Sequence, residues 1–522
     1  MQGQQDGEPE VRLAEVIAAL SLAIDLNVGQ SMEHALRSAV LAVRLGGALG
    51  LSESELVDAY YLALLRHVGC TAEARVAAAV FQDEIAARTW FTPVVNGRRT
   101  EVFAAIVQHL GRDHPPLARA RRLIATFASL PQLLQAVQAE CEVAQRLAER
   151  WGFGEGVQCA LAQALERWDG GGMPNHLKGE AIALPMRVVQ LALDAELFFR
   201  LGGVEAVVAM ARRRAGGAHD PTIVERFCRE APGLLVGLDR ESAWDMALAA
   251  EPGPRPRLSA AQLDATARAI ADFVSLQSPY LAGHSNGVAE LAAGAARGLG
   301  LPEADAVTLR RAGWLHDLGR VAVSAGIWAK PGPLSDGEWE RVRLHPYYTE
   351  RILARPKVLA PFGALAAMHH ERLDGSGYYR RLAAPALPLL ARVLASADVY
   401  QALTEPRPHR PARAAGEAAD ELRREVRAGR LDAEATNAVL AAAGHRVRSR
   451  RRGWPAGLTE REVEVLRLVT RGLGNREMAR RLGLSERTVH HHIQHIYDKL
   501  GVSTRAAATL SAMQHDLLEI TG

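Results

Sequence analysis

The stretch Leu315-His316-Asp317-Leu318-Gly319 pairs an imidazole with a carboxylate inside an apolar run. Imidazole nitrogen and carboxylate oxygen are both ligands that borderline divalent metals accept. Adjacent His and Asp occur by chance in many chains, so the neighbourhood decides what the pair means. Working outward, we find further imidazoles and a further carboxylate at His284, His345, His369, His370 and Asp398. A single His is more often a core or surface residue than a ligand, but seven such residues together predict a metal site.

Short motifs accompany these residues. They are His284-Ser285, His316-Asp317-Leu318-Gly319-Arg320, Lys330-Pro331-Gly332-Pro333-Leu334, His345-Pro346, His369-His370-Glu371-Arg372-Leu373-Asp374-Gly375-Ser376-Gly377-Tyr378 and Ala397-Asp398-Val399-Tyr400. In order and spacing, over residues 260 to 445, they resemble the HD-GYP family of metal-dependent phosphodiesterases. That family hydrolyses cyclic dinucleotides, typically cyclic di-GMP. The resemblance implies an all-α helical bundle that holds two divalent metal ions, iron or manganese.

The resemblance also implies roles for individual residues. His284, His316, Asp317 and Asp398 would hold one metal, and His345, His369 and His370 the other, with Asp317 bridging. Two ions held close together clamp phosphate oxygens and lower the pKa of a bridging water. The catalytic group would be Asp317, Arg320 and Lys330. The substrate would be bound by Arg320, Lys330, Asp374, Gly377 and Tyr378.

Three positions depart from the family pattern. Arg320 stands where the family usually has Lys, and its guanidinium can still grip phosphate with two hydrogen bonds. Tyr379 replaces the Pro of the Gly-Tyr-Pro signature, and Gln401 replaces an Asp often found after the last ligand. Neither of the last two changes removes a ligand, so they bear on substrate choice or rate. They also leave open a second interpretation, in which the domain binds a nucleotide without hydrolysing it.

Length and composition bound the remaining possibilities. A chain of 522 residues predicts two to four domains. Its 62 basic and 59 acidic residues are unevenly spread, because the segment from His445 onward carries 14 basic and 8 acidic residues. A basic end on a slightly acidic body favours nucleic-acid binding. With no apolar run of membrane-spanning length and no signal-peptide pattern, we expect a soluble cytoplasmic protein without membrane contact.

The first half repeats the second. Glu33-His34-Ala35 through Gly69 aligns with Gly283-His284-Ser285 through Gly319 at a constant offset of 250 residues. Glu166 through Gly172 aligns with Glu371 through Gly377 at an offset of 205, so the first half has about 45 extra residues in its middle. We therefore predict a degenerate HD-GYP-like domain over residues 11–245.

The ligands of this first copy are replaced. The aligned positions are Arg66, His67, Glu140, Ala164 and Leu165, with His34 retained and Asp194 one residue out of register. An Arg in the ligand shell repels a divalent ion, so we expect no catalytic metal cluster here. The domain is then structural or dimerising, or else it senses a ligand. Cys70, Cys141, Cys159 and Cys228 lack metal-type spacing and read as buried thiols in a reducing cytosol.

Two linkers divide the chain. The Pro- and Gly-rich run from Glu251 to Pro256 separates the first domain from an HD-GYP-type domain over residues 258–445. The run from Arg446 to Pro455 holds five Arg within seven residues. It is either a solvated linker or, as we favour beside a DNA-binding module, a source of phosphate contacts.

Residues 455–522 predict four helices with a tight turn before the third, the arrangement of a DNA-binding helix-turn-helix. Thr459 and Glu462 form a capping box, and Ser485 caps the third helix. Leu458-Thr459-Glu460-Arg461-Glu462, Asn475-Arg476-Glu477-Met478-Ala479, Thr488-Val489 and Lys499-Leu500-Gly501-Val502 resemble the LuxR-type DNA-binding domain. The resemblance implies DNA contacts from Arg487, Thr488, His490, His491, Gln494, Lys499 and Arg505. His490-His491-His492 and His495 lack a further Cys or carboxylate that would complete a metal site.

The sequence therefore predicts an all-α, three-part bacterial regulator with tandem HD-domain helical bundles followed by a LuxR-type domain. In the first interpretation it hydrolyses a cyclic dinucleotide, with cyclic di-GMP the expected substrate, and binds double-stranded DNA as a homodimer. In the second it is a nucleotide-sensing transcription factor without catalysis. A third possibility, a di-iron oxygenase of the HD type, has no supporting residue.

Overall fold

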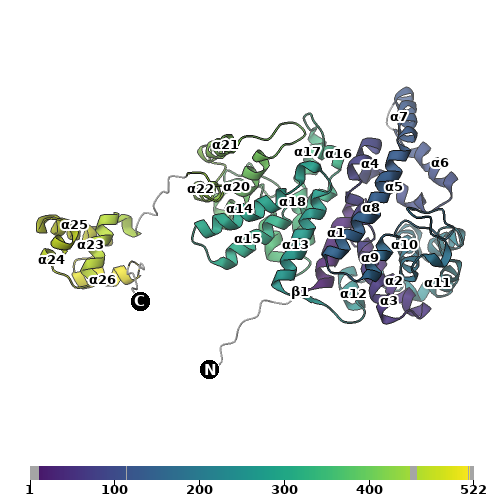
Figure 1. Ribbon diagram of the computed structural model, residues 1–522, viewed down its shortest axis with the longest axis horizontal. Helices are drawn as coiled ribbons and strands as arrows, with labels where there is room; N and C mark the ends of the chain where they lie inside the picture. Colours follow the sequence, from purple (N-terminus) through teal and green to yellow (C-terminus); the bar gives the residue numbers. More distant parts are fainter. Residues whose placement is uncertain (1–10, 113–114, 447–454, 515–516, 518–522) are drawn as a thin grey trace. The chain divides into compact units, whose positions relative to one another are not determined.

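The computed structural model describes residues 11–112, 115–446, 455–514 and 517. Within that part, regular structure is almost entirely helical, and the strands β1 (Val11–Arg12) and β2 (Arg257–Leu258) are two residues long each. The predicted all-α class is confirmed (Figure 1). Among the described residues, no helix combines the length and the apolar character needed to cross a membrane.

The chain separates into two compact units, which meet in the sequence between His445 and Arg446. The first unit contains both predicted HD domains, and the second contains the C-terminal module. Most of the Arg-rich run predicted to contact phosphate, residues 447–454, lies outside the described residues.

The first half of the first unit is a sequence of helices. They are α1 (Leu13–Asn27), α2 (His34–Leu49), α3 (Glu53–Leu65), the 3₁₀ turn η1 (Val68–Thr71), α4 (Ala74–Phe81), α5 (Glu84–Val95), α6 (Arg99–His109), α7 (Pro116–Ala128), α8 (Leu130–Arg150), α9 (Glu155–Leu161), η2 (Gly179–Ala181), α10 (Leu184–Arg214), α11 (Pro221–Leu234) and α12 (Ala243–Ala250). Non-helical backbone angles at Gly202 and Gly203 divide α10 into two pieces.

The second half repeats this plan with fewer residues. Its elements are α13 (Ala260–Ser275), η3 (Pro279–Leu281), α14 (His284–Gly298), α15 (Glu303–Leu315), η4 (Leu318–Ala322), α16 (Ala325–Trp328), α17 (Asp336–Arg343), α18 (His345–Leu353), α19 (Ala360–Ala366), η5 (Ala384–Ala386), α20 (Leu389–Thr404), α21 (Ala415–Arg427) and α22 (Ala433–Ala442). Helix starts follow local chemistry: Ser259 and Gln262 form a capping box on α13, and Ser335 and Glu338 form one on α17.

The internal repeat is visible as a shared turn. A Cβ atom at Gly319 would lie 2.1 Å from the carbonyl oxygen of His345, and one at Gly69 would lie 2.0 Å from that of Glu140. Only Gly permits so close a backbone approach, so both halves pack a 3₁₀ turn on a neighbouring helix in the same way. The extra residues of the first half form α5, α6 and α7.

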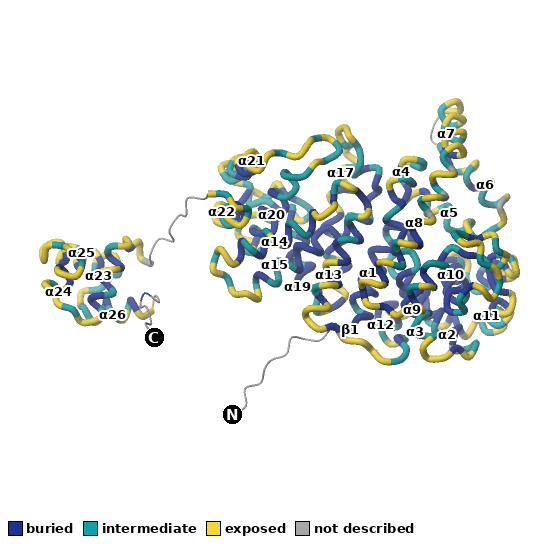
Figure 2. The backbone as a smooth tube through the Cα atoms, viewed as in Figure 1, coloured by how far each residue is buried: buried dark blue, intermediate teal, exposed yellow. Residues whose placement is uncertain are grey.

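Helix α1 lies where the two halves meet (Figures 1 and 2). All of its residues except Glu15 and Leu26 are buried. It packs on α2 and α3 of its own half and on η4 and α18 of the other half. A single apolar core runs from Val11 and α1 through Leu318 to Ile352. The pairing of β1 with β2, Val11 opposite Leu258, ties the start of the first half to the start of the second.

A second contact joins the halves beside the predicted metal site. The carboxylate of Glu84, at the start of α5, accepts hydrogen bonds from Ser324 Oγ (2.6 Å) and from the backbone N–H of Ala325 (2.7 Å). Glu84 is fully buried. The two bonds occupy the first turn of α16, where backbone N–H groups have no partner within the helix. The degenerate half therefore supplies part of the N-terminal cap of a second-half helix.

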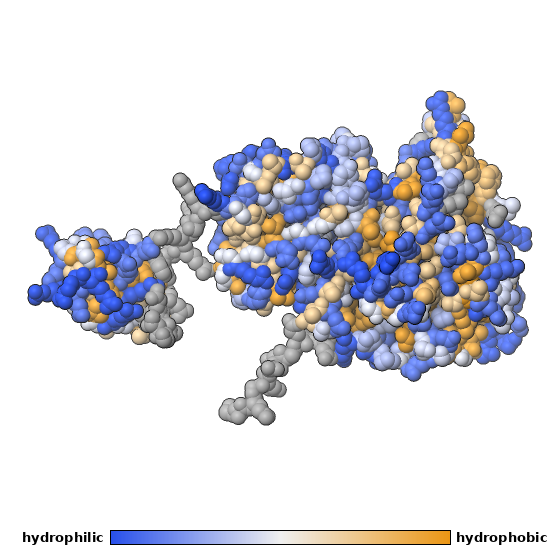
Figure 3. Space-filling model, viewed as in Figure 1, coloured by the Kyte–Doolittle hydropathy of each residue, from blue (hydrophilic) through white to orange (hydrophobic). Residues whose placement is uncertain are grey.

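The inserted helices of the first half expose apolar side chains. Phe103 is 56% exposed, Leu117 68% and Ile124 71%. Figure 3 shows apolar surface beside hydrophilic surface around the protruding α7.

Two of the four cysteines are not buried. Cys159, on the outward face of the short helix α9, is exposed, and Cys228 is partly exposed. The prediction of four buried thiols is therefore wrong for these two.

The C-terminal unit contains η6 (Pro455–Gly457), α23 (Glu460–Thr470), α24 (Asn475–Leu482), α25 (Glu486–Leu500) and α26 (Arg505–Gln514). The capping box of Thr459 and Glu462 and the cap by Ser485 form as the sequence predicts. Gly483, with φ +64°, ends α24 and allows the tight turn into α25. Val489, Ile493 and Ile496 form the buried stripe of α25.

Candidate metal centre

Most of the predicted ligands lie at the ends of helices, and Asp398 lies within α20. His316 and Asp317 occupy the junction between α15 and η4, where the chain turns sharply onto α18. Thr349 secures this turn, because its hydroxyl donates to the carbonyl of His316 (3.0 Å) and accepts from the N–H of Gly319 (2.8 Å). His284 and His345 stand at the first positions of α14 and α18. Two helix starts and the end of α15 therefore bring their ligands into one buried volume.

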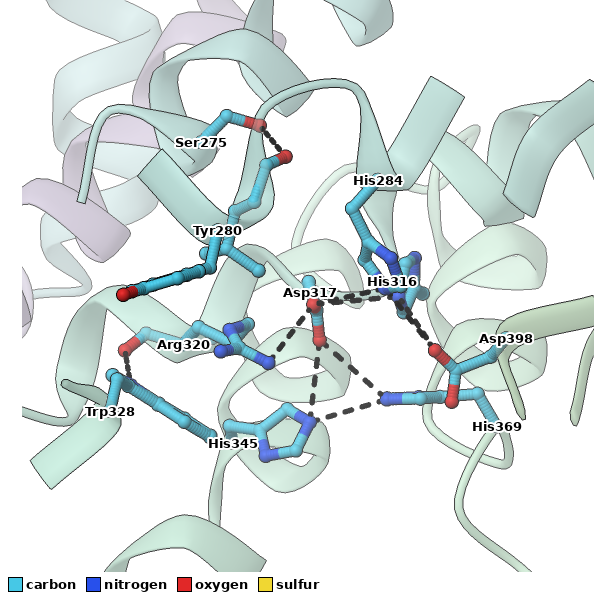
Figure 4. A network of polar contacts seen from close by, with 12 residues as sticks. Ser275, Tyr280, His284, His316, Asp317, Arg320, Trp328, His345, His369 and Asp398 are labelled. Atoms are coloured by element: carbon cyan, nitrogen blue, oxygen red, sulfur yellow. Dashed lines mark hydrogen bonds and ion pairs between the residues drawn. The ribbon is translucent and has the colours of Figure 1, made fainter. Parts of the chain in front are cut away.

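Asp317 lies at the centre of this volume (Figure 4). Its Oδ1 lies 3.4 Å from His345 Nε2 and 3.7 Å from His369 Nε2. Its Oδ2 lies 3.5 Å from His316 Nε2 and 4.0 Å from His284 Nε2. One carboxylate thus presents each oxygen to a different pair of imidazoles, which is the geometry a bridging ligand requires.

Asp398, from α20, closes the cluster on the other side. Its Oδ1 lies 3.3 Å from His284 Nε2, and its Oδ2 lies 3.7 Å from His370 Nδ1. Two triads have ligand atoms within 4.8 Å of one another: His284, His316 and Asp398, and His345, His369 and His370. The structure therefore brings all seven residues predicted as metal ligands into one cluster.

The far sides of the imidazole rings are fixed by hydrogen bonds. The Nδ1 atoms of His316, His345 and His369 bond to the carbonyl oxygens of Gly313 (2.7 Å), Val342 (2.6 Å) and Ala366 (2.6 Å). An N–H at Nδ1 leaves a lone pair on Nε2, the arrangement typical of metal-binding His. His316 Nε2 is buried and, within the described residues, has no hydrogen-bond partner. The donor set and this unpartnered nitrogen fit a bound metal.

Most of the candidate ligands have the protonation state that metal binding requires. Burial lowers the pKa of His369 to about 3 and that of His345 to about 4, so both rings are neutral. Burial would raise the pKa of Asp317, but Arg320 and the surrounding imidazoles hold it well below its usual range. Burial also lowers the pKa of His284, yet hydrogen bonds with Asp398 and Glu405 outweigh this effect and raise it to about 9. Metal binding would displace that proton.

Arg320 lines the cluster. Its Nη1 lies 3.4 Å from Asp317 Oδ2, and its guanidinium carbon lies 3.7 Å from the centre of the Trp328 ring. The Trp328 N–H also donates to the carbonyl of Arg320 (3.3 Å). Lys330 behaves differently: its ammonium bonds to Glu338 Oε2 (2.6 Å), and in the described part of the chain it has no ion pair with a ligand residue.

The loop after His370 closes over the site. Buried Glu371 accepts hydrogen bonds from the N–H groups of Arg380 and Leu382, both at 2.8 Å. Gly377 packs on this segment, since a Cβ there would lie 2.5 Å from the carbonyl oxygen of His370. The Tyr378 ring centre lies 4.6 Å from that of His370.

Two other residues of this loop have partners of their own. Asp374 is exposed and accepts bonds from the N–H (2.9 Å) and the hydroxyl (2.6 Å) of Ser376, which makes it a turn residue. Tyr379 donates its hydroxyl to Glu350 and lies beside Arg380. Of the predicted substrate-binding residues, Arg320 and Tyr378 thus contact metal-ligand side chains, whereas Asp374 and Lys330 bond within their own segments.

Sequence reasoning missed three supporting residues, Glu405, Trp328 and Arg407. Glu405 accepts from His284 Nδ1 (2.8 Å) and is itself bonded by Gln401 (2.7 Å) and Arg407 (3.0 Å). A separation of seven residues between Asp398 and Glu405, two helical turns, was the available signal. Trp328 and Arg407 carried no sequence signal. Gln401, noted as a departure from the family pattern, belongs to the supporting layer behind His284.

The first half keeps the scaffold and loses the ligands. His34 bonds to Glu196, which Arg200 also contacts. Asp194, the uncertain position, is bonded by Arg214, by His219 Nε2 (2.9 Å) and by Asn96 (3.1 Å), so its carboxylate is fully engaged. Among the described residues of this half, one group with possible metal ligands remains, formed by His67, Cys70 and Glu140.

In the C-terminal unit, α25 presents most of the predicted DNA contacts. Arg487, Thr488, His490, His491 and Gln494 are exposed. Lys499 forms an ion pair with Glu462 (2.7 Å), and Arg505 donates to the carbonyl of Leu473. These two cations therefore stabilise the unit itself. The possible metal-ligand groups found among the described residues do not include the His-rich run of α25.

Residues 268–435 match the HD domain family, and residues 456–512 match the family described as "Bacterial regulatory proteins, luxR family". The chain is 33% identical over 411 residues to 3'3'-cGAMP-specific phosphodiesterase 3 of Vibrio cholerae serotype O1, which covers 77% of this chain and 88% of that protein. The chain belongs to the HD-GYP phosphodiesterase family. A match of 411 residues exceeds the length of the second domain, so this HD-GYP relative shares the degenerate half as well.

Other relatives agree with this assignment. A solved structure of a cyclic GMP-AMP specific phosphodiesterase from Vibrio cholerae is 29% identical, with a TM-score of 0.57, and covers 84% of this chain and 99% of that one. A cyclic di-GMP phosphodiesterase of Pseudomonas aeruginosa is 42% identical over 136 residues, 26% of this chain and 33% of that protein. The predicted fusion of an HD-GYP protein to a LuxR-type domain is confirmed.

Proposed function

We propose that the second HD domain is a metal-dependent cyclic-dinucleotide phosphodiesterase and that the C-terminal unit binds double-stranded DNA. The observation that carries the catalytic proposal is the pair of ligand triads on either side of Asp317. Two divalent ions, iron or manganese, would supply Lewis-acid charge and an acidified water when bound. The first triad with Asp317 Oδ2 would hold one ion, and the second with Oδ1 would hold the other.

The chain's own residues would hold the substrate around these ions. The Arg320 guanidinium, kept in place by Trp328, faces the cluster and can grip a phosphate with two parallel hydrogen bonds. His345 and His369 are neutral and would not offset the charge of the bound ions, so the occupied site would be positive toward an anionic diester. Tyr378, packed on His370, offers a hydroxyl and a flat apolar surface at the edge of the cluster. Lys330 would reach the substrate only by leaving Glu338.

The substrate we place first is 3'3'-cGAMP, because a relative that shares both halves of the chain is specific for it. Cyclic di-GMP is the competing substrate, and relatives that match only part of the chain act on it. The exposed face of α25 supports the DNA proposal, and exposed Leu510 and Met513 on α26 support a homodimer. A protein that reads chromosomal DNA in this way would work in the cytoplasm.

The test is hydrolysis by the purified full-length chain loaded with manganese or anaerobically with iron. We expect linear dinucleotide product from at least one of the two cyclic substrates. Asp317→Asn, which keeps the shape of the side chain but removes its charge, should lower the metal content and abolish product. Asp336→Asn, an exposed carboxylate on α17, is the matched control and should leave both unchanged.

Each outcome separates the candidate functions. Undiminished metal content in Asp317→Asn would refute the bridging role. A metal-loaded wild-type protein that binds either dinucleotide tightly and releases no product would instead support a nucleotide-sensing transcription factor. Two features support that alternative: Tyr379 is turned toward Glu350, and the chain carries a DNA-binding unit.

A further inference from the structure

A second polar cluster is buried in the degenerate half. Cys70 Sγ is hydrogen-bonded to Glu140 Oε1 and lies 3.8 Å from His67 Nδ1. The three potential ligand atoms all lie within 4.8 Å of one another. Cys70 and Glu140 are each 6% exposed. His67 immediately precedes η1, Cys70 lies within it, and Glu140 comes from α8, 70 residues after Cys70 in the chain.

The scaffold of this cluster is the one that carries Asp317 in the second half. The offset of 250 residues places His67 at the position of Asp317 and Cys70 at the position of Arg320. The offset of 205 places Glu140 at the position of His345. The matching close approaches at Gly69 and Gly319 show that both turns pack alike. The first half has therefore lost the catalytic ligands but carries three other donor atoms on the same turn and helix.

We propose that His67, Cys70 and Glu140 bind a single divalent ion of the zinc class. Imidazole nitrogen, thiolate sulfur and carboxylate oxygen are the donors that zinc takes, commonly with water in a fourth position. The thiol proton now lies between Sγ and the Glu140 carboxylate. Binding breaks the S–H bond, forms a metal–sulfur bond and releases the proton to solvent. The site is distinct from the catalytic cluster and does not depend on the proposed hydrolysis.

Two guanidinium groups, of Arg66 and Arg88, lie near this cluster, so the ligands must supply negative charge to hold a dication. Arg88 donates to Glu73 (2.7 Å), which leaves this neighbouring pair neutral. Arg66 adds a positive charge nearby, so ligands that are all neutral would bind a dication poorly. A thiolate and a carboxylate together neutralise the ion's two charges.

Cobalt substitution provides a specific test, because thiolate-bound cobalt absorbs in the near ultraviolet. All four Cys residues lie in the first half, and the seven candidate ligands of the second half include no sulfur. We expect the full-length protein loaded with cobalt to show this charge-transfer band. The band should persist in Asp317→Asn, which weakens the other cluster, and disappear in Cys70→Ser. Metal analysis of Asp317→Asn should still find about one zinc per chain.

Control variants make the outcome decisive. Cys141→Ser and Cys228→Ser should keep the band, and circular dichroism verifies that each variant is folded. Glu140→Gln retains the thiol and should weaken cobalt binding by at least about ten-fold, as loss of a ligand or its support typically does. A wild-type protein without the band would overturn the proposal. So would a band that survives in Cys70→Ser, or unchanged cobalt affinity in Glu140→Gln.

Discussion

At the scale of single residues, hydrogen bonds at the Nδ1 atoms hold the imidazole rings of the candidate metal centre in place. Each ring of His316, His345 and His369 bonds to a backbone carbonyl three residues earlier in the chain. His284 is the exception, because its Nδ1 bonds to the Glu405 carboxylate. A carboxylate behind a ligating imidazole fixes the ring and raises its basicity. Glu405 therefore positions the ring of His284, a candidate metal ligand.

Removing Glu405 tests this layer. Glu405→Ala should lower the affinity of the first metal by about 10- to 100-fold, the usual effect of losing such a partner. Competition with a chelator measures the affinity. Glu417→Ala, on the exposed start of α21, is the control and should bind metal as the wild type does. Equal affinities of Glu405→Ala and wild type would show that Arg407 or solvent holds His284 equally well.

The residues that sequence predicted and those that it missed differ in chemistry. The seven candidate ligands stood out because they appeared in recognisable motifs in the right order. Glu405 bonds to His284, 121 residues away in the chain, and its spacing from Asp398 was its only signal, whereas Trp328 stacks on Arg320 with no signal in the sequence. Lys330 and Asp374 were predicted from motif position alone, and the structure gives both of them local partners. The position of a residue in a motif therefore does not by itself predict which groups its side chain contacts.

At the scale of elements, α16 links the half without the candidate metal centre to the half that contains it. Glu84 caps its first turn, and its last residue, Trp328, supports Arg320. A Cβ at Gly326 would lie 2.6 Å from the carbonyl oxygen of Gln82, so the two segments are in direct contact. Helix boundaries follow from capping residues that sequence reveals. The cap that crosses between domains could not be foreseen, because no local pattern joins Glu84 to Ser324.

Glu84→Ala should therefore affect catalysis from the other domain. Loss of two buried hydrogen bonds should destabilise the protein by about 1–3 kcal/mol. The substrate KM should rise as Arg320 loses its support, while metal content stays unchanged. Thermal unfolding and steady-state kinetics measure these effects. Arg341→Ala removes only the half-exposed ion pair with Asp83 at the same contact and should cost at most about 1 kcal/mol. Unaltered kinetics in a destabilised Glu84→Ala would assign Glu84 a purely structural role.

Helix α25 supplies the second prediction at this scale. His491→Ala and Gln494→Ala should each reduce discrimination for the specific operator by about 1–3 kcal/mol and leave non-specific binding nearly unchanged. Lys499→Ala should instead lower the melting temperature of the unit, because its ammonium is paired with Glu462. Binding titrations on operator and random DNA, alongside melting curves, distinguish the two classes. A uniform loss on both DNAs in His491→Ala would contradict base recognition.

At the scale of the whole molecule, the property to test is coupling between the proposed nucleotide site and the proposed DNA-binding surface. Fusion alone produces no coupling, which requires that the nucleotide bind the DNA-competent and DNA-incompetent states with different affinity. We predict that a cyclic dinucleotide changes operator affinity by about 5- to 150-fold, the usual range of allosteric coupling. Titrating operator with and without nucleotide, using wild-type protein kept metal-free to prevent turnover, measures the effect.

Truncation after His445 provides the control for coupling, because the chain divides into its two compact units there. The truncated protein should hydrolyse nucleotide normally and bind no DNA. Superimposed operator curves, with nucleotide shown to be bound, would mean that hydrolysis and DNA binding merely share a chain.

The position of α1 has a consequence for how the protein is made. One face of this buried helix packs on α2 and α3, which leave the ribosome immediately after it. The other face packs on η4 and α18, which follow roughly 300 residues later. At about 5–20 residues per second, synthesis leaves that face uncovered for about 15 to 60 s. During this interval the nascent chain presents an apolar helix to its surroundings, so the yield of folded protein should depend on chaperones and on translation speed.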